Sequence, residues 1–230
     1  MWVAELSNSH NGDYARAVRM LHAAKAAGAT AAKVQCYTPE ELVMLRGDGP
    51  APAPWGAQGW SMYDLYAHAM TPRDWFEPLF DEAARIDLPL FASVFGMDSL
   101  ALMEQCRCPA YKIARLDNQQ RALIDACTAT GKPLIVSAAM HDPIPPHIHR
   151  DAIVLYCAPG YPQLDPELSE PYGITFDGLS YHGTEPAIGA RAAALGAQMV
   201  EVHFHLADEP SVLEANISLN EHQFAAMVGR

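Results

Sequence analysis

The chain has no long apolar run and relatively few basic residues. None of its hydrophobic stretches approaches the ~20 residues that a membrane-spanning helix needs, and its start lacks the pattern of a signal peptide. Lys and Arg total 15 against 27 Asp and Glu, which gives a formal net charge of -12. We therefore predict a cytoplasmic protein with no nucleic-acid or membrane partner, in which any anionic ligand is met by local cations.

Cysteine is also scarce, and the count of five is odd for a disulfide framework. Cys106 and Cys108 lie close together, but no second pair accompanies them as in a structural zinc site. Reduced thiols are the favoured interpretation, and a Cys-x-Cys metal site is the weaker alternative. Half of the 230 residues are hydrophobic and no linker divides them, so we predict one domain over residues 1–230.

Short apolar runs alternate with helix-like segments along the chain. The strand candidates are residues 2–6, 31–35, 90–94, 110–113, 134–137, 153–157, 178–180 and 199–204. Helical spacing and capping signals predict helices over residues 14–27, 72–86, 98–106, 118–130, 185–195 and 221–228. Eight strands joined by crossovers predict an α/β fold, a compact (β/α)8 or TIM barrel.

Three crossovers depart from this regular pattern. Prolines in residues 141–150 and 159–171 predict crossover helices that are shortened or missing. The connection over residues 38–71 is instead long, and its part 46–60 is rich in Gly, Pro and Ala. We expect that part to be either a mobile lid or a packed surface loop.

The alternation within strands predicts which side chains face the barrel interior. In the last strand, the apolar residues at 200, 202 and 204 alternate with Glu201, His203 and His205, so this polar set should point inward. The same reasoning turns Lys33 and Lys112 inward, in a chain that has four lysines. A buried ammonium needs a counter-charge, which leaves two interpretations: internal ion pairs or a bound anion.

The polar residues around these lysines keep both interpretations open. Glu5 and Glu201 are also predicted to face inward and would form the ion pairs. Ser93, Ser137 and Ser180 lie near other strand ends, where hydroxyl donors beside cations suit a phosphate or carboxylate. We favour the anion site at the carboxyl ends of the strands, where barrel enzymes place their catalytic groups.

Histidines supply a second candidate site. His182 follows the seventh strand and His203 lies on the eighth, so both imidazoles can reach one divalent ion such as Mn, Fe, Co or Zn. The alternative is that each is a packed or surface histidine. His205 is a third ligand, a substrate contact or neither. We expect no specific role for His68, His147, His149 and His222, which lie in helix or loop context.

Several motifs occur in a specific order. They are Ala-Glu-Leu-Ser-Asn-Ser-His-Asn-Gly at 4–12, Lys-Val-Gln at 33–35, Tyr-Lys-Ile at 111–113, Gly-Leu-Ser at 178–180 with His182, and Glu201 with His203 and Phe204. Together they resemble the sialic acid synthase (N-acetylneuraminate synthase) family over nearly the whole chain. The resemblance implies a (β/α)8 barrel that joins phosphoenolpyruvate to the aldehyde of an acylated amino sugar, releasing phosphate and leaving a 2-keto acid.

The resemblance also implies roles for individual residues. His182 and His203 match metal ligands, the ion being typically Mn, with Mg, Co, Fe or Zn as alternatives. Glu5 matches an acidic group near the reacting carbons, so our catalytic set is Glu5, His182 and His203. The resemblance and the inward positions together predict substrate binding by Lys33, Gln35, Ser93, Lys112, Arg115, Ser137, Tyr161, Ser180 and Glu214.

Departures from the family pattern concern phosphate and sugar positions. Arg115 stands where the family has a serine that touches phosphate, and Tyr181 stands where it has Asp. We expect no counterpart in this chain of the family's C-terminal antifreeze-like domain, which the resemblance implies would give an arginine to the partner's sugar site. We expect the acceptor to be recognised by the barrel, by residues 46–60 or by another protein, and we leave a homodimer open.

Two alternatives to the synthase reaction remain at this point. One is a metal-dependent lyase, isomerase or epimerase that acts on a sugar acid or sugar phosphate. The other is a barrel that binds a ligand without turnover.

Overall fold

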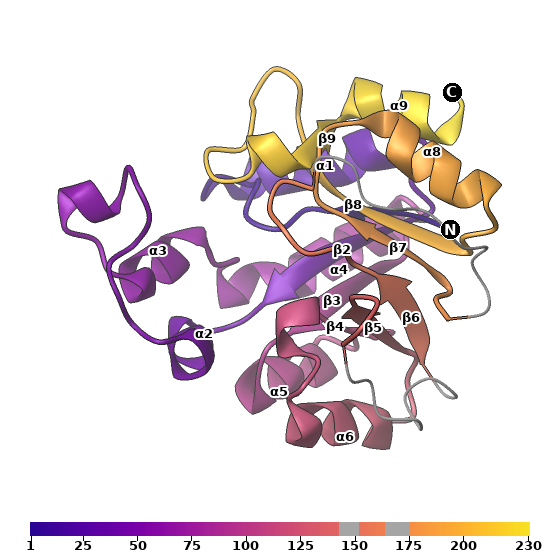
Figure 1. Ribbon diagram of the computed structural model, residues 1–230. Coiled ribbons are helices and arrows are strands. Elements are labelled where there is room, and N and C mark those ends of the chain that lie inside the picture. Colours follow the sequence, from indigo (N-terminus) through magenta and orange to yellow (C-terminus); the bar gives the residue numbers. More distant parts are fainter. Residues whose placement is uncertain (143–151, 164–174) are drawn as a thin grey trace.

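Eight parallel strands close into a barrel in the computed structural model, which describes residues 1–142, 152–163 and 175–230 (Figure 1). Each strand pairs with the next, and β1 pairs with β8 to close the ring. The strands are β1 (Trp2–Glu5), β2 (Ala31–Cys36), β3 (Leu90–Val94), β4 (Tyr111–Ile113), β5 (Leu134–Ala138), β6 (Ile153–Tyr156), β7 (Gly178–Tyr181) and β8 (Met199–His205). The predicted fold class and all eight predicted strands are confirmed.

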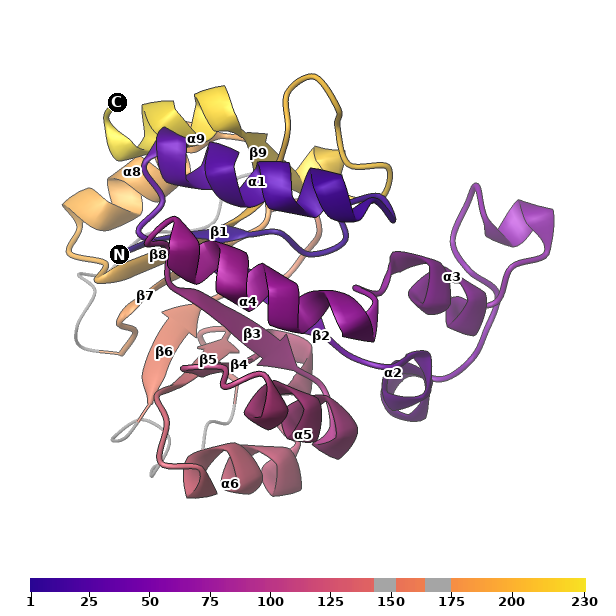
Figure 2. The same cartoon turned by 180° about the vertical axis from the view of Figure 1, so that it is seen from behind.

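Helices lie on the outside of the barrel (Figures 1 and 2). They include α1 (Tyr14–Ala27), α4 (Phe76–Arg85), α5 (Met97–Gln105), α6 (Arg121–Ala129), α8 (Pro186–Ala194) and α9 (Glu221–Val228). Helix α1 begins at the side-chain cap of Asp13 and ends at Gly28, whose φ of 102° is readily adopted by glycine. None of the helices in the described ranges is long and apolar enough to cross a membrane.

The β8 strand shows how alternation divides the core from the site. Val200, Val202 and Phe204 are buried in the apolar layer between barrel and helices, and the ring of Phe204 meets Phe224 of α9 at 5.7 Å between centroids. Glu201 is buried on the opposite face of the strand. Apolar packing outside the barrel therefore fixes the direction of the polar side chains inside it.

Some predicted bounds and elements differ from the structure. Helix α6 begins three residues later than predicted, because residues Arg115–Asp117 form the short 3-10 helix η3 and Asn118 donates to the Ser137 carbonyl. The sequence does not predict β9 (Ser218–Asn220), which pairs with the end of β8 and is too short to show a period. Most of the two proline-rich crossovers, residues 143–151 and 164–174, lies outside the described residues, so the prediction of shortened helices there stays a prediction.

The long connection over residues 38–71 contains two short helices rather than only a loop or lid. They are α2 (Pro39–Arg46) and α3 (Met62–Ala69), with the 3-10 helix η1 (Gly56–Gln58) between them. Capping boxes begin both helices, formed by Thr38 with Glu41 and by Ser61 with Asp64. We call residues 38–71 the α2–α3 segment; it projects to one side of the barrel, beyond the carboxyl end of β2 (Figure 1).

Candidate active site

A pocket of about 190 Å³ lies at the carboxyl ends of the strands. Eleven of the predicted site residues line it: Lys33, Gln35, Ser93, Lys112, Arg115, Ser137, Tyr161, Ser180, His182, His203 and Glu214. Arg46, Phe95, Cys157 and Glu201 line it as well, although they are not in the predicted set. The strands thus bring residues far apart in the sequence to the end of the barrel where catalytic groups belong.

A buried ion-pair network forms the inner wall of the pocket. Lys112 Nζ lies 2.8 Å and Lys33 Nζ 3.5 Å from the same oxygen, Oε1 of Glu201. Ser180 Oγ donates to that oxygen at 3.1 Å, and Lys33 Nζ also contacts Glu5 Oε2. Internal ion pairing, one of the two interpretations of the inward lysines, is therefore present in the structure, and the lysines line the pocket at the same time.

The network changes the pKa values of its members in opposite directions. Burial alone would raise the pKa of the Glu201 carboxyl, but Lys112 and Lys33 hold it below its usual value. Burial opposes the charge of Lys33, yet Glu201 and Glu5 raise its pKa above the usual value. For Lys112 burial dominates and lowers the pKa, so this ammonium is the easier of the two to deprotonate.

Two polar atoms of the pocket walls have unused hydrogen-bonding capacity. Ser137 Oγ and Glu201 Oε2 are buried and have no hydrogen-bond partner among the described residues. Burying such atoms without a partner is unfavourable, and both residues line the pocket. A polar ligand in this pocket, which Lys112 also lines, would satisfy the Ser137 hydroxyl.

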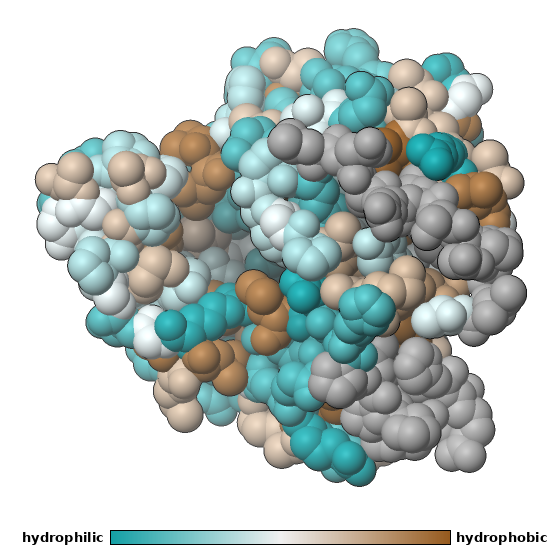
Figure 3. Space-filling model, viewed as in Figure 1, coloured by the Kyte–Doolittle hydropathy of each residue, from teal (hydrophilic) through white to brown (hydrophobic). Residues whose placement is uncertain are grey.

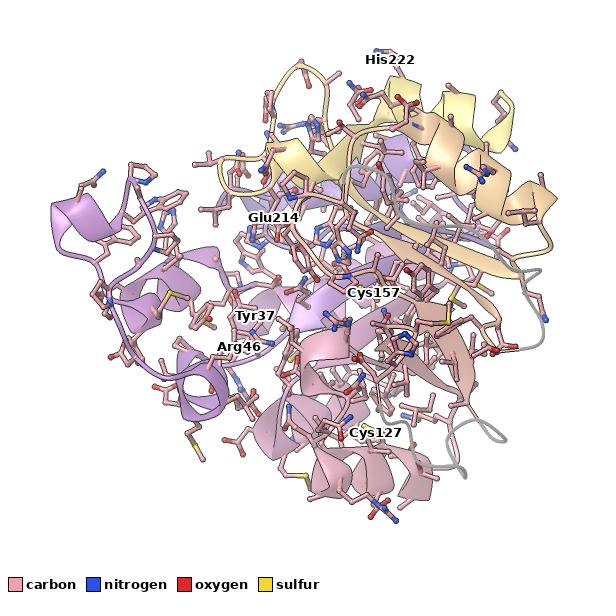
Figure 4. All side chains as sticks on the ribbon, in the orientation of Figure 1. Tyr37, Arg46, Cys127, Cys157, Glu214 and His222 are labelled. Atoms are coloured by element: carbon pink, nitrogen blue, oxygen red, sulfur yellow. The ribbon has the colours of Figure 1, made fainter. Side chains whose placement is uncertain are left out.

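The two predicted metal ligands lie next to each other. The ring centroids of His182 and His203 are 4.9 Å apart. Nδ1 of His203 lies 3.1 Å from Oε2 of Glu214, which orients the ring and leaves Nε2 for a cation. Nδ1 of His182 lies 3.5 Å from Nε2 of Gln163 and 3.8 Å from Sγ of Cys157; Figure 4 labels Glu214 and Cys157 beside this part of the site.

The two imidazoles differ in basicity. Burial lowers the pKa of His182 well below its usual value, and the neighbouring His203 lowers it further. Burial also disfavours charge on His203, but the carboxylate of Glu214 raises its pKa above the usual value. A neutral His182 is the form that binds a metal ion.

The donor set limits how a metal ion would be held. Within the described ranges, no group of three or more His, Cys, Asp or Glu side chains is arranged to hold a metal ion. Two imidazoles still suit a divalent transition ion that takes its other ligands from substrate or water. His205 does not join them: its Nδ1 lies 2.9 Å from the Leu206 carbonyl, and it does not line the pocket.

Two arginines line the outer part of the pocket, and aspartates orient both. Arg115 donates from Nε and Nη2 to Asp142 at 3.0 and 3.3 Å. Arg46, from the last turn of α2, donates from Nη2 to Oδ2 of Asp117 at 2.7 Å. Arg46 was predicted only as the first residue of a Gly-, Pro- and Ala-rich stretch; the Thr38–Glu41 capping box was the available signal that residues 39–46 form a helix.

Other predicted residues occupy supporting positions. Glu5 does not line the pocket but is buried behind Lys33, and its Oε1 accepts from the Ser7 amide at 2.6 Å. Gln35 donates to Ser7 Oγ at 2.9 Å, and the Tyr161 ring lies 4.4 Å from that of His182. The structure therefore brings the predicted residues together, with Glu5 reaching the pocket through Lys33.

These features define a (β/α)8 barrel with an enzyme-like pocket of paired imidazoles, buried lysines and hydroxyl donors. A family model described as the NeuB family matches residues 20–230. The chain is 33% identical to the pseudaminic acid synthase of Helicobacter pylori, an alignment that covers 98% of this chain and 72% of that protein. The chain therefore belongs to the NeuB family, and the prediction of a sialic acid synthase-type enzyme is confirmed.

More distant relatives agree with this assignment. The chain is 26% identical to the N-acetylneuraminate-9-phosphate synthase of Homo sapiens, with 98% of this chain and 67% of that protein covered. The crystal structure of N-acetylneuraminic acid synthetase from Leptospira borgpetersenii serovar Hardjo-bovis superposes with a TM-score of 0.81 at 23% identity. That comparison covers 99% of this chain and 80% of the other, and it supports the fold.

Proposed function

We propose that this chain condenses phosphoenolpyruvate, or a close relative, with the aldehyde of a sugar to give a 2-keto acid and phosphate. Synthases of the NeuB family join phosphoenolpyruvate to a sugar. The observation that carries the proposal is one pocket lined by His182 and His203, whose ring centroids are 4.9 Å apart, together with Lys112 and Ser137. A divalent ion, Mn before Mg, Co, Fe or Zn, is part of the proposal.

The chain's own residues supply most of the binding and orientation. The ammonium of Lys112, the Ser137 hydroxyl and the guanidinium of Arg115 suit the charged oxygens of phosphoenolpyruvate. Glu201 bridges and orients the two lysines, since both ammonium groups approach one of its oxygens. Glu5 acts through Lys33, which it contacts from behind the pocket wall.

The reaction balances with one water molecule. The methylene carbon of phosphoenolpyruvate bonds to the aldehyde carbon, whose oxygen becomes a hydroxyl after taking a proton. Water adds to the carbon that bears the phosphate, and loss of phosphate from that carbon leaves the keto group. When bound at His182 and His203, a divalent ion would polarise the aldehyde oxygen and favour ionisation of a water molecule.

The direct test measures phosphate release. Purified protein with Mn and phosphoenolpyruvate should release phosphate only when an acceptor from a panel of aldehydes and amino sugars is present. Exchange of a carbon-bound proton in deuterated water without phosphoenolpyruvate would favour a lyase, isomerase or epimerase. Bound but unchanged ligand would favour a non-catalytic barrel, and absence of both binding and phosphate release contradicts the proposal.

The metal centre is tested by metal retention. His203→Ala should lose Mn during dialysis, and Glu214→Gln should weaken Mn binding about 10- to 100-fold because it no longer orients the His203 ring. His222→Ala is the matched control, since His222 is exposed on α9. The metal site would be refuted if mass spectrometry found that all three variants kept Mn equally well.

A cytoplasmic location and a homodimer stay predictions.

A further inference from the structure

The pocket is small for two substrates. Pockets for small molecules usually measure about 300–1,000 Å³, whereas this one has about 190 Å³. The surface is hollowed between the barrel and the α2–α3 segment (Figure 3). An acceptor that meets phosphoenolpyruvate at the histidines would therefore extend outward, along the side of the pocket that this segment forms.

Arg46 is the cation that the α2–α3 segment contributes to the pocket. Its guanidinium carbon lies 5.7 Å from the ring centroid of Phe95, and its Nη2 is held by Asp117. Figure 4 labels Arg46 near Tyr37, at the junction of the segment with the barrel. A guanidinium held on one edge and one face is already oriented, so binding through its other edge costs little side-chain entropy.

Arg46 is more exposed than the two buried lysines, and it uses fewer of its N–H groups on the protein than Arg115 does. The side chains of Lys33 and Lys112 are 5% and 2% exposed and are paired with buried glutamates, whereas that of Arg46 is 27% exposed. Arg115 uses both Nε and Nη2 on Asp142. In the part of the chain that the structure describes, Arg46 donates to Asp117 through Nη2 alone, out of the five N–H groups of a guanidinium.

We propose that Arg46 determines acceptor specificity by binding an anionic substituent, a phosphate or a carboxylate, that lies away from the reacting aldehyde. This inference rests on the proposed condensation, since it names the class of acceptor. The buried lysines and Ser137 would bind the first anion, and Arg46 would bind the second one nearer to solvent. A planar guanidinium with a free edge suits both oxyanions, because each offers paired oxygens.

A matched set of acceptors tests this role: N-acetylmannosamine, its 6-phosphate, and the corresponding uronic acid. The wild type should show a lower KM for at least one charged sugar than for the neutral one. Arg46→Gln should raise that KM about 10- to 100-fold, the value of one or two charge-assisted bonds, and leave the KM for the neutral sugar within about twofold. Comparison of the 6-phosphate with the uronic acid identifies whether Arg46 binds a phosphate or a carboxylate.

Controls separate recognition from folding. Arg121→Gln removes the same charge from an exposed helical pair with Asp125 and should leave the preference unchanged. Arg46→Gln alone leaves Asp117, which is 2% exposed, without its cation, so the double variant Arg46→Gln/Asp117→Asn removes the pair together. If the double variant keeps the preference, or if the wild type prefers the neutral sugar, Arg46 does not determine specificity.

A failure of the proposed condensation can be distinguished from a failure of the Arg46 inference. If no acceptor supports phosphate release, calorimetric binding of the three sugars to the wild type and to Arg46→Gln still measures the role of Arg46. Tighter binding of a charged sugar that depends on Arg46 would support the inference. Equal binding of that sugar by both proteins would overturn it.

Discussion

The barrel interior and the α2–α3 segment present charge to one pocket in different ways. Inside the barrel, Lys112 and Glu201 are buried almost completely, and their charges compensate each other. At the α2–α3 segment, Arg46 is partly exposed and reaches a buried partner, Asp117, in a different element of the chain. Substitutions of the interior pair should therefore change folding stability, whereas substitutions of Arg46 should change which ligand is bound.

The largest expected loss of stability is that of the variant Glu201→Gln, in the barrel interior. It leaves Lys112 and Lys33 buried beside each other without their shared carboxylate, so the free energy of unfolding should fall by about 3–5 kcal/mol. Urea denaturation monitored by circular dichroism measures the change. Asp125→Asn, which breaks an exposed pair with Arg121, should change stability by less than about 1 kcal/mol.

A double variant shows whether charge imbalance is the cause. Lys112→Met/Glu201→Leu removes both members of the pair and leaves Lys33 with Glu5, so it should recover much of the stability lost in Glu201→Gln. Equal instability of the two proteins would mean that packing, and not charge, makes the interior sensitive.

A second test concerns the seam where the α2–α3 segment returns to the barrel. There Nε2 of His10 lies 3.3 Å from Oγ1 of Thr71, and burial lowers the pKa of His10 to about 4. Because this pKa is below the unfolded value, the unfolded state takes up the proton first, and stability is lost as the pH falls below about 6.5. The contribution should be about 2 kcal/mol smaller at pH 5 than at pH 7, and about 3 kcal/mol smaller at pH 4.

The measurement is the pH dependence of urea unfolding in the wild type and in His10→Gln. The variant cannot take up this proton, so its stability should fall less steeply between about pH 7 and pH 5. His222→Gln on the exposed face of α9 should retain the wild-type slope. Parallel slopes for all three proteins would show that His10 does not make the seam sensitive to acid.

The same two regions mark what the sequence could predict. Alternation in β8 predicts the inward direction of Glu201 and His203 because a strand repeats every two residues and its apolar face must pack against helices. The partner of an inward charge carries no such local signal. Lys112 meets Glu201 across 89 residues, a pairing with no local signal; ion pairing was one of two alternatives, and the anion site was the favoured prediction.

The helices of the α2–α3 segment were harder to predict from the sequence, for a physical reason. The segment's helices have eight residues each, too short for a helical period to stand out, and the residues between them are rich in Gly, Pro and Ala. The site residue that it contributes, Arg46, is placed by contacts with Phe95 and Asp117 that depend on the tertiary fold. The Thr38–Glu41 capping box is a local signal for the start of α2 that the sequence-based prediction did not use, and it carries no information on what the end of that helix touches.

The smallest expected effect comes from Glu41, which joins the α2–α3 segment to helix α5 on the outside of the barrel. Its Oε2 accepts from the amide of Thr38 at the start of α2, and its Oε1 accepts from the amide of Ser99 in the first turn of α5, both at 3.0 Å. Glu41→Ala should therefore lower the free energy of unfolding by about 1 kcal/mol, the value of a helix cap. Because Arg46 ends the same helix, the KM for a charged acceptor should also rise, by less than in Arg46→Gln.

Urea denaturation and the KM for a charged acceptor together show whether Glu41 only stabilises the fold or also positions Arg46. Glu77→Ala is the control, since Glu77 is an exposed acidic residue in the first turn of α4 and does not line the pocket. A loss of stability with an unchanged KM would mean that Arg46 is held by Asp117 and Phe95 alone, independently of how α2 is attached. A change in both would mean that the barrel positions the acceptor-binding arginine through the carboxylate that caps α2 and α5, and the two regions would then act as one site.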